Sequence, residues 1–209
     1  GYADVIYAWD VVNEAADENQ YDGLRRSYWY QIIGPDYLYY AFLYAREAET
    51  LYAKQYASLY GLDADTDDLS SIQPKLFYND YNEWFGSRSD AIIHFLTEEP
   101  WNENHEKVKS SVINPDGDGT IYGDGLLDGI GMQGHLDDTQ NIEQYMIALE
   151  KYNAAVPELH ITELDIGRTG TDANANYYQA KFYYEFFSRL IEEVKKGVNL
   201  TCDIMGINR

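Results

Sequence analysis

The sequence predicts an α/β fold with a parallel sheet, and more narrowly a sector of a (β/α)-barrel. Short runs rich in β-branched and aromatic residues alternate with longer segments of helical periodicity, which is typical of βαβ units. The strand runs stay largely apolar until their last positions, as expected when both faces of a sheet are buried. Polar residues then gather where four of these strands end, and active sites lie at that end of a (β/α)-barrel.

A doubly wound sheet is the main alternative, because it also alternates strands and helices. It would bind its ligand at one switch point, whereas polar residues follow four strands here. The sequence also contains no glycine-rich phosphate loop that opens a helix. We count five strands and four helices, whereas an eight-stranded barrel needs roughly 250 residues. The 209 residues therefore predict either an incomplete barrel or a smaller open fold.

The first half of the chain predicts two strands and two helices. A strand over 4–12 precedes a long amphipathic helix over 36–61, which follows Gly34-Pro35 and stops at Gly61. A second strand covers 74–82. The next helix covers 87–99, and Ser87 or Ser89 is the expected N-cap because a hydroxyl can accept from a free backbone N–H.

The second half of the chain repeats the alternation. A strand over 126–136 precedes a helix over 139–155, and a strand over 158–166 precedes a helix over 174–197. The last helix ends in a basic turn and a glycine, as the helix dipole and the left-handed C-cap favour. A fifth strand covers 199–207.

Composition and charge exclude several classes of partner. The formal net charge of −21 repels nucleic acid and anionic membrane surfaces, and it suits a neutral substrate. No apolar run is long enough to span a membrane. The single cysteine, Cys202, excludes an internal disulfide framework. Most of the 21 tyrosines are expected in the core, and the rest can offer flat platforms to ligands such as sugar rings.

Two glutamates carry the strongest chemical signal. Glu14 ends the first strand and Glu163 lies near the end of the fourth. Glycoside hydrolysis uses paired carboxyl groups, one to protonate the leaving oxygen and one to attack the anomeric carbon or to activate water. A single glutamate at a strand end is more simply explained as a charge facing solvent or a basic partner. Two such residues at the same end of a barrel favour catalysis.

Polar neighbours strengthen this interpretation. Asn13 can bind a sugar hydroxyl next to the scissile bond. Gln133 and His135 are two residues apart and are expected on one face of their strand. His135 can hold a nucleophilic carboxylate, although a satisfied core histidine is the alternative. Asp165 is expected to point the same way as Glu163 and to orient a neighbour or raise the pKa of the acid.

Four ordered motifs resemble one known family. "WDVVNEA", "LFYNDYN", "DGIGMQGHL" and "ITELDI" together resemble glycoside hydrolase family 10, the endo-β-1,4-xylanases. The segment 23–48 is also typical of the stretch that follows the acid/base strand in this family. The resemblance covers nearly the whole chain and implies a (β/α)8 barrel, a TIM barrel, of which residues 1–209 supply about strands 4 to 8. The implied domain is a partial catalytic domain that lacks the first three βα units.

The resemblance also implies roles for individual residues. Glu14 corresponds to the general acid/base and Glu163 to the nucleophile of a retaining, double-displacement mechanism. Asn13 is similar to the residue that binds the sugar 2-hydroxyl, and His135 to the residue hydrogen-bonded to the nucleophile. No cofactor is implied. The remaining matches are residues that line the cleft or follow the nucleophile: Asn79, Tyr81, Gln133 and Asp165.

The sequence departs from the family at both ends. Strands one to three are missing, and Met205 stands where the family usually has a tryptophan. We therefore expect the remaining barrel strands to come from another chain or from another part of the precursor. The implied partner is xylan or a xylo-oligosaccharide. The resemblance implies a secreted, cell-surface or periplasmic protein, although the sequence shows no signal peptide.

Two further features leave alternatives open. Trp84 can stack on a distal sugar or simply cover the barrel rim. Asn114, Asp116 and Asp118 resemble part of a calcium loop, but the pattern fails at its twelfth position, so no metal is predicted and a solvated turn is favoured.

Two other functions remain possible on the sequence. One is a retaining β-glycanase that acts on glucan or on mixed substrates. The other is a non-catalytic carbohydrate-binding barrel, although a pure binder has no need of two matched carboxylates.

Overall fold

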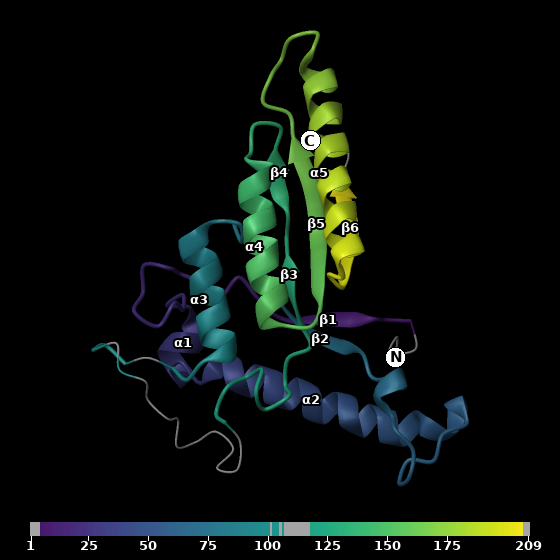
Figure 1. Ribbon diagram of the computed structural model, residues 1–209. Helices are drawn as coiled ribbons and strands as arrows, with labels where there is room; N and C mark the ends of the chain where they lie inside the picture. Colours follow the sequence, from purple (N-terminus) through teal and green to yellow (C-terminus); the bar gives the residue numbers. More distant parts are fainter. Residues whose placement is uncertain (1–4, 101, 105, 107–117, 207–209) are drawn as a thin grey trace.

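The structure is a computed structural model of the chain, and it describes residues 5–100, 102–104, 106 and 118–206. Within these ranges six strands form one sheet, and every pairing between them is parallel (Figure 1). β1 pairs with β2, β2 with β3, and β5 with β3, β4 and β6. The strands are β1 (Ala8–Asn13), β2 (Lys75–Asp80), β3 (Gly129–Met132), β4 (His135–Asp137), β5 (Leu159–Gly167) and β6 (Leu200–Gly206).

The strand expected over 126–136 is two strands separated by a kink. β3 pairs with the start of β5 and β4 pairs with its end, so both lie on the same side of β5. Gly134 sits in the kink with φ +74°, a conformation that glycine adopts without steric cost. With β3 and β4 counted as one interrupted strand, spatial order follows chain order. This arrangement is that of a barrel sector and has no switch point of the kind found in a doubly wound sheet.

Helices follow the strands as predicted, with one addition. The long helix ends at Tyr56 and continues as a 3-10 turn to a left-handed Gly61, which confirms the predicted stop. The short helix α1 was not expected from the sequence. The helices are α1 (Tyr28–Ile33), α2 (Tyr37–Tyr56), α3 (Gly86–Thr97), α4 (Ile142–Ala155) and α5 (Ala175–Lys196), and the 3-10 turns are Ala57–Tyr60 and Ser70–Ile72.

Helix caps confirm some expectations and correct one. Neither Ser87 nor Ser89 caps α3: the N-cap position is Phe85, and the Ser89 hydroxyl donates back to the Gly86 carbonyl. Both serines lie inside the first turn of α3 and not at its N-cap, so their hydroxyls are not placed to accept from the free N–H groups at the start of the helix. Asn141 caps α4 through its side chain, and Gly197 ends α5 in the left-handed conformation.

One continuous core joins the strands to the helices. α2 packs against β1 and β2, α3 beside α4, and α4 beside α5, and Figure 1 shows the last three helices standing next to one another. Tyr145 of α4 meets Phe186 of α5 edge-on, with ring centroids 5.0 Å apart. Burial of these apolar surfaces is the main force that holds the sheet against its helices. The fully buried large side chains include Phe42, Phe77, Tyr78, Ile92, Leu96, Ile130, Met132, Leu149 and Phe186.

The two outer strands differ from the inner ones in exposure. β1 and β6 each pair with one neighbour in the described part of the chain, and they leave Trp9 51%, Ile204 50% and Met205 68% exposed. By contrast, five of the six positions of β2 and all four of β3 are buried. Among the described residues, no helix combines the length and the apolar character needed to cross a membrane.

Candidate active site

The turn after β1 aims Glu14 away from the strand. Glu14 has φ +58°, a conformation that is uncommon for a residue other than glycine. Its backbone N–H donates to the Asn79 carbonyl at 2.9 Å, and the next N–H, of Ala15, donates to the Tyr78 hydroxyl at 2.9 Å. Burial, together with the nearby Asp80 carboxylate, holds the pKa of the Tyr78 phenol well above its usual value, so it stays protonated. Strand β2 therefore fixes the direction of Glu14.

The Glu14 carboxylate has two side-chain partners. Oε1 accepts a hydrogen bond from Gln133 Nε2 at 3.1 Å, and Oε2 lies 3.5 Å from Arg25 Nη1. Arg25 also donates to the Tyr81 hydroxyl at 3.1 Å. The Glu14 side chain remains 36% exposed. Its carboxyl is thus oriented by an amide and a guanidinium while it stays accessible to a ligand.

Glu163 is held inside the sheet by two different partners. Its Oε1 accepts from Asn79 Nδ2 at 3.0 Å, and its Oε2 lies 3.3 Å from His135 Nε2. The other ring nitrogen of His135 lies 3.0 Å from Asp165 Oδ1. Asp165 is buried, whereas the Glu163 side chain is 29% exposed. The imidazole therefore bridges a buried carboxylate and an accessible one.

A chain of amides connects the two glutamates. Asn13 Oδ1 accepts from Asn79 Nδ2 and from Gln133 Nε2, each at 3.1 Å. Gln133 also donates to Glu14 and Asn79 also donates to Glu163, so these two amides and Asn13 link the two glutamates. Thr162 supports the chain because its hydroxyl donates to Asn79 Oδ1 at 2.7 Å. Asn79 and Gln133 are each only 2% exposed, and buried polar groups whose hydrogen bonds are satisfied form rigid networks.

One end of this network, Asn13 and Glu14, borders the larger of the two cavities described here, whereas Glu163 does not line that cavity. A hollow of about 590 Å³ is lined by Asn13, Glu14 and Arg25 together with aromatic and aliphatic side chains of α1 and α2, among them Trp29, Ile33, Tyr37, Tyr40 and Tyr44. Polar groups that converge in a mostly apolar hollow are typical of ligand sites.

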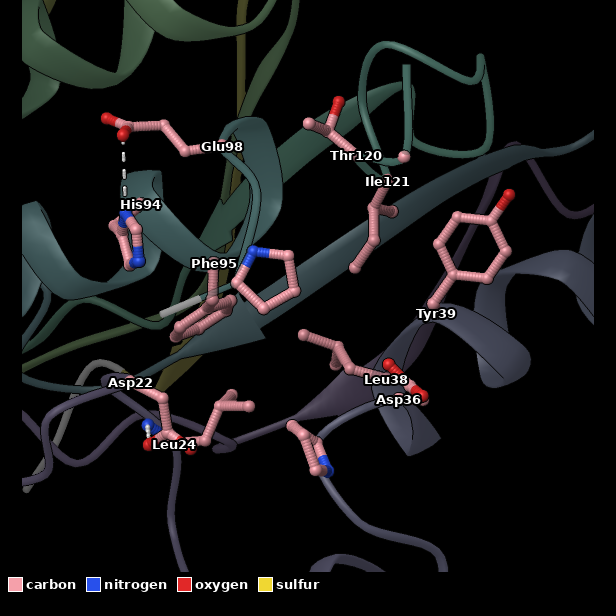
Figure 2. Close-up of a pocket in the computed structure, with 13 residues that line it drawn as sticks. Asp22, Leu24, Asp36, Leu38, Tyr39, His94, Phe95, Glu98, Thr120 and Ile121 are labelled. Atoms are coloured by element: carbon pink, nitrogen blue, oxygen red, sulfur yellow. Dashed lines mark hydrogen bonds and ion pairs between the residues drawn. The ribbon is translucent and has the colours of Figure 1, made fainter. Parts of the chain in front are cut away.

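A second cavity lies apart from these residues. Figure 2 shows it between the start of α2, helix α3 and the segment around Ile121. Its volume is about 40 Å³, and none of the predicted site residues lines it. Leu38, Phe95 and Ile121 point into it, and the one ion pair drawn there joins His94 to Glu98 at 3.5 Å. The paired glutamates therefore do not belong to this cavity.

The predicted convergence of polar side chains is confirmed, but one argument for it was wrong. Gln133 and His135 were expected on one face of a continuous strand, whereas the kink at Gly134 separates them. The kink re-aims both side chains, so Gln133 reaches Glu14 and His135 reaches Glu163. Tyr81 lies beside the network through its contact with Arg25.

The structure corrects the prediction that Trp84 stacks on a sugar. This residue was a candidate sugar platform, but its side chain is only 4% exposed and belongs to the core. Its ring packs against Phe85 and Tyr145, with centroids 5.4 and 6.2 Å away. Asn82 has φ +52°, so the chain turns after β2, and the tryptophan that follows is buried against α4. A ring with so little exposed surface cannot stack on a sugar.

The weak calcium candidate stays untested in part. Asn114 and Asp116 lie outside the described residues. Asp118 accepts from the backbone and hydroxyl of Thr120 at 2.7 and 2.8 Å, as in a turn. Within the described ranges, no group of three acidic, histidine or cysteine side chains is placed to hold a metal ion.

Arg25 is a site residue that sequence reasoning missed. It sits ten residues beyond Ala15, whose carbonyl accepts from the Arg25 N–H at 2.7 Å. The antiparallel bridge between Ala16 and Leu24 folds this loop back over the end of β1. A turn sequence, Asp22-Gly23, was the available signal, but the loop length alone does not indicate that Arg25 returns to Glu14.

Comparison with known proteins gives a consistent result. The model of glycosyl hydrolase family 10 matches residues 1–202. The endo-1,4-beta-xylanase A of Thermotoga neapolitana is 40% identical over 197 residues, which are 93% of this chain and 14% of that protein. A protein of Acetivibrio thermocellus named exoglucanase XynX is 33% identical over 189 residues, 90% of this chain and 13% of its own length.

A solved structure agrees in fold. The crystal structure of TsXylA, an intracellular xylanase from Thermoanaerobacterium saccharolyticum, superposes with a TM-score of 0.67 at 30% identity, over 97% of this chain and 48% of that one. A variant of TsXylA has been solved in complex with xylotetraose. The parallel sheet thus matches part of a barrel, and the chain spans about half of the solved structure and about a seventh of the Thermotoga relative.

Proposed function

The chain belongs to glycosyl hydrolase family 10, and from this premise we propose that it contributes the catalytic pair of a retaining endo-β-1,4-xylanase, with Glu14 as general acid/base and Glu163 as nucleophile. One observation carries the proposal. The two carboxyl groups project from the same end of a parallel sheet and are linked through Gln133, Asn13 and Asn79. Retention requires carboxyl groups about 5–5.5 Å apart, and this linkage holds the two as one unit.

In the first step the glycosidic bond is broken. Glu14 donates its proton to the glycosidic oxygen, a Glu163 oxygen bonds to the anomeric carbon, and the bond from that carbon to the leaving oxygen breaks. The product is a shortened chain released with a new hydroxyl and a glycosyl ester on Glu163. Asn79 and His135 hold the Glu163 oxygens in place for this attack.

In the second step water replaces the ester. Glu14, now ionised, takes a proton from water as the water oxygen bonds to the anomeric carbon, and the bond to Glu163 breaks. Both carboxyl groups return to their starting protonation states. Asn13 Oδ1 already accepts from two protein donors, so a sugar hydroxyl is recognised through its Nδ2 group.

Completion of the barrel is part of the proposal. The family spans about twice this length in the solved structure above, and β1 leaves Trp9 half exposed. We infer that further βα units, from the same polypeptide or from a second chain, pair with this edge and complete the substrate cleft. Xylan or xylo-oligosaccharides are the expected ligands.

The test is hydrolysis by the full-length protein. Release of reducing sugar is measured from xylan, cellulose and mannan, and again with Glu14→Ala and Glu163→Ala. Activity on xylan that both substitutions lower by about 100-fold or more is the expected result. Undiminished activity of Glu163→Ala would overturn the assigned mechanism, and binding without hydrolysis of any of the three would favour a non-catalytic barrel.

A β-glucanase is the second candidate. The relative named exoglucanase XynX supports it, since it is 33% identical to this chain. Preferential release of sugar from cellulose in the same assay would favour this alternative and would leave the assignment of the two carboxyl groups intact.

A further inference from the structure

The kink between β3 and β4 positions two residues of the site at once. Gln133 directly precedes Gly134 in the kink and contacts Glu14, and His135 directly follows Gly134 and contacts Glu163. Gly134 between them has φ +74°, and a Cβ there would come within 2.9 Å of Ile161 Cγ2. A shift of this one peptide would therefore move the contacts of both carboxyl groups.

A buried carboxyl group holds that peptide. The Gly134 N–H donates to Glu83 Oε1 at 3.1 Å, and the Glu83 side chain is 0% exposed. The Glu83 backbone is fixed in turn, because the Tyr152 hydroxyl of α4 donates to its carbonyl at 3.0 Å. The other Gly134 backbone group, its carbonyl, accepts from the Asp165 N–H at 3.3 Å. Glu83 thus supplies the partner of an N–H that no strand pairing satisfies.

The surroundings of Glu83 favour its neutral form. Burial is the main cause that raises the pKa of Glu83, the Gly134 N–H lowers it and the Asp80 carboxylate raises it, and the pKa that results is about 8. The titratable groups that face it are Asp80 of β2 and the phenols of Tyr145 and Tyr152 of α4. A neutral carboxyl group accepts from Gly134 through its carbonyl oxygen, as a glutamine would.

We propose that Glu83 is a positioning residue, which fixes the Gly134 peptide so that Gln133 reaches Glu14 and His135 reaches Glu163. It touches neither substrate nor reacting atoms. Its effect on turnover rests on the proposed function, but its effect on the position of His135 does not. The two claims can therefore fail separately.

The test compares Glu83→Gln with Glu83→Met in the full-length protein. Glutamine keeps an oxygen at the same reach, whereas methionine has a similar length and no oxygen. We expect Glu83→Gln to keep kcat on xylan within about twofold. We expect Glu83→Met to lose about 10- to 100-fold in kcat with little change in KM, because misplacement by about 1 Å costs up to about 100-fold.

A readout independent of catalysis is the nuclear magnetic resonance signal of the His135 ring, assigned by loss of the signal in His135→Asn. The ring signals are expected to move in Glu83→Met and to stay in place in Glu83→Gln. If Glu83→Met does not fold, Glu83→Asp takes its place, since its carboxyl is one methylene too short to reach Gly134. Unmoved ring signals in whichever of these two folds would overturn the proposal, whatever the activity on xylan.

Glu49→Gln is the matched control. Glu49 of α2 is also a buried acid, it pairs with Arg46 at 2.8 Å, and burial raises its pKa to about 7. It makes none of the contacts described for the site. Its substitution is expected to leave the His135 signals and kcat unchanged, and a change as large as that of Glu83→Met would show a general effect of losing a buried acid.

The pH dependence of stability separates the variants further. Because the pKa of Glu83 is raised from its unfolded value of 4.5 to about 8, the folded state retains this proton as pH rises. This contribution to stability is complete below pH 4.5 and is lost progressively up to about pH 8. The free energy of unfolding of Glu83→Gln is therefore expected to fall less steeply with pH over this window. Parallel curves would contradict the buried neutral acid.

Discussion

The two carboxyl groups of the site lie in contrasting parts of one sheet. Glu163 belongs to β5, which has strand neighbours on both sides, and two protein side chains contact its oxygens. Glu14 follows β1, which pairs only with β2 in the described part of the chain, and its carboxyl faces the hollow of about 590 Å³. The region around Glu163 is thus formed by strand pairing, whereas the region around Glu14 depends on a turn and a loop.

The roles that we propose for the two carboxyl groups give this difference a chemical reason. A nucleophile must attack from one direction, and strand pairing holds it rigidly. An acid/base group exchanges protons with a leaving group and then with water, so it needs access. Arg25 and Gln133 orient Glu14 without enclosing it.

The largest expected effect comes from removing each carboxyl group. Glu163→Ala is expected to lower kcat by about four orders of magnitude or more with any substrate, as for other covalent nucleophiles. Glu14→Ala is expected to lose about 100- to 10,000-fold on xylan, and much less on an aryl xyloside whose leaving group needs no proton. Steady-state kinetics on both substrates measure this contrast. Equal losses on both substrates for Glu14→Ala would break the assignment.

Trp84→Ala tests the packing beneath the central strands. The buried ring is expected to contribute about 3–5 kcal/mol to the free energy of unfolding, because its removal leaves a cavity against Tyr145. Denaturant unfolding measures the loss. A fully stable variant with a raised KM for xylan would restore Trp84 as a sugar platform.

Asn79→Ala tests the link between the two regions. The substitution leaves the Asn13 and Glu163 oxygens without one donor each and is expected to cost about 1–3 kcal/mol in stability. A fall in kcat of about 10- to 100-fold is expected as well, because the nucleophile loses a positioning contact. Asn79→Asp is the matched control, since it keeps the size but replaces the donor with an acceptor. Wild-type kcat in both variants would contradict the linked network.

Arg25→Met is expected to have the smallest effect. Its ion pair with Glu14 is 3.5 Å long between side chains that are 39% and 36% exposed, and such pairs contribute about 0–1 kcal/mol. The melting temperature is therefore expected to change little, and kcat by no more than about fivefold. A loss of kcat as large as that of Glu14→Ala would show that Glu14 depends on Arg25 as strictly as Glu163 depends on its partners.

Much of the fold and of the site was predictable from the sequence. Periodicity predicted the alternation, and polar residues at strand ends predicted which end carries the site. The interruption at Gly134 was not predictable, because the run over 126–136 contains three glycines and nothing local marks which of them breaks the strand. The burial of Trp84 was also not predictable, because it depends on the turn at Asn82 and on the position of α4.

By itself, the sequence determined the class of fold and the alternation of its main strands and helices, and it singled out the two carboxyl groups as candidates. These follow from local periodicity and from residue types, which are written along the chain. Only the tertiary structure decided that Gln133 joins Glu14 to Asn13, that Arg25 returns to the end of β1, and that Glu83 holds Gly134. These contacts join residues far apart in sequence, and their geometry depends on parallel strand register and helix packing.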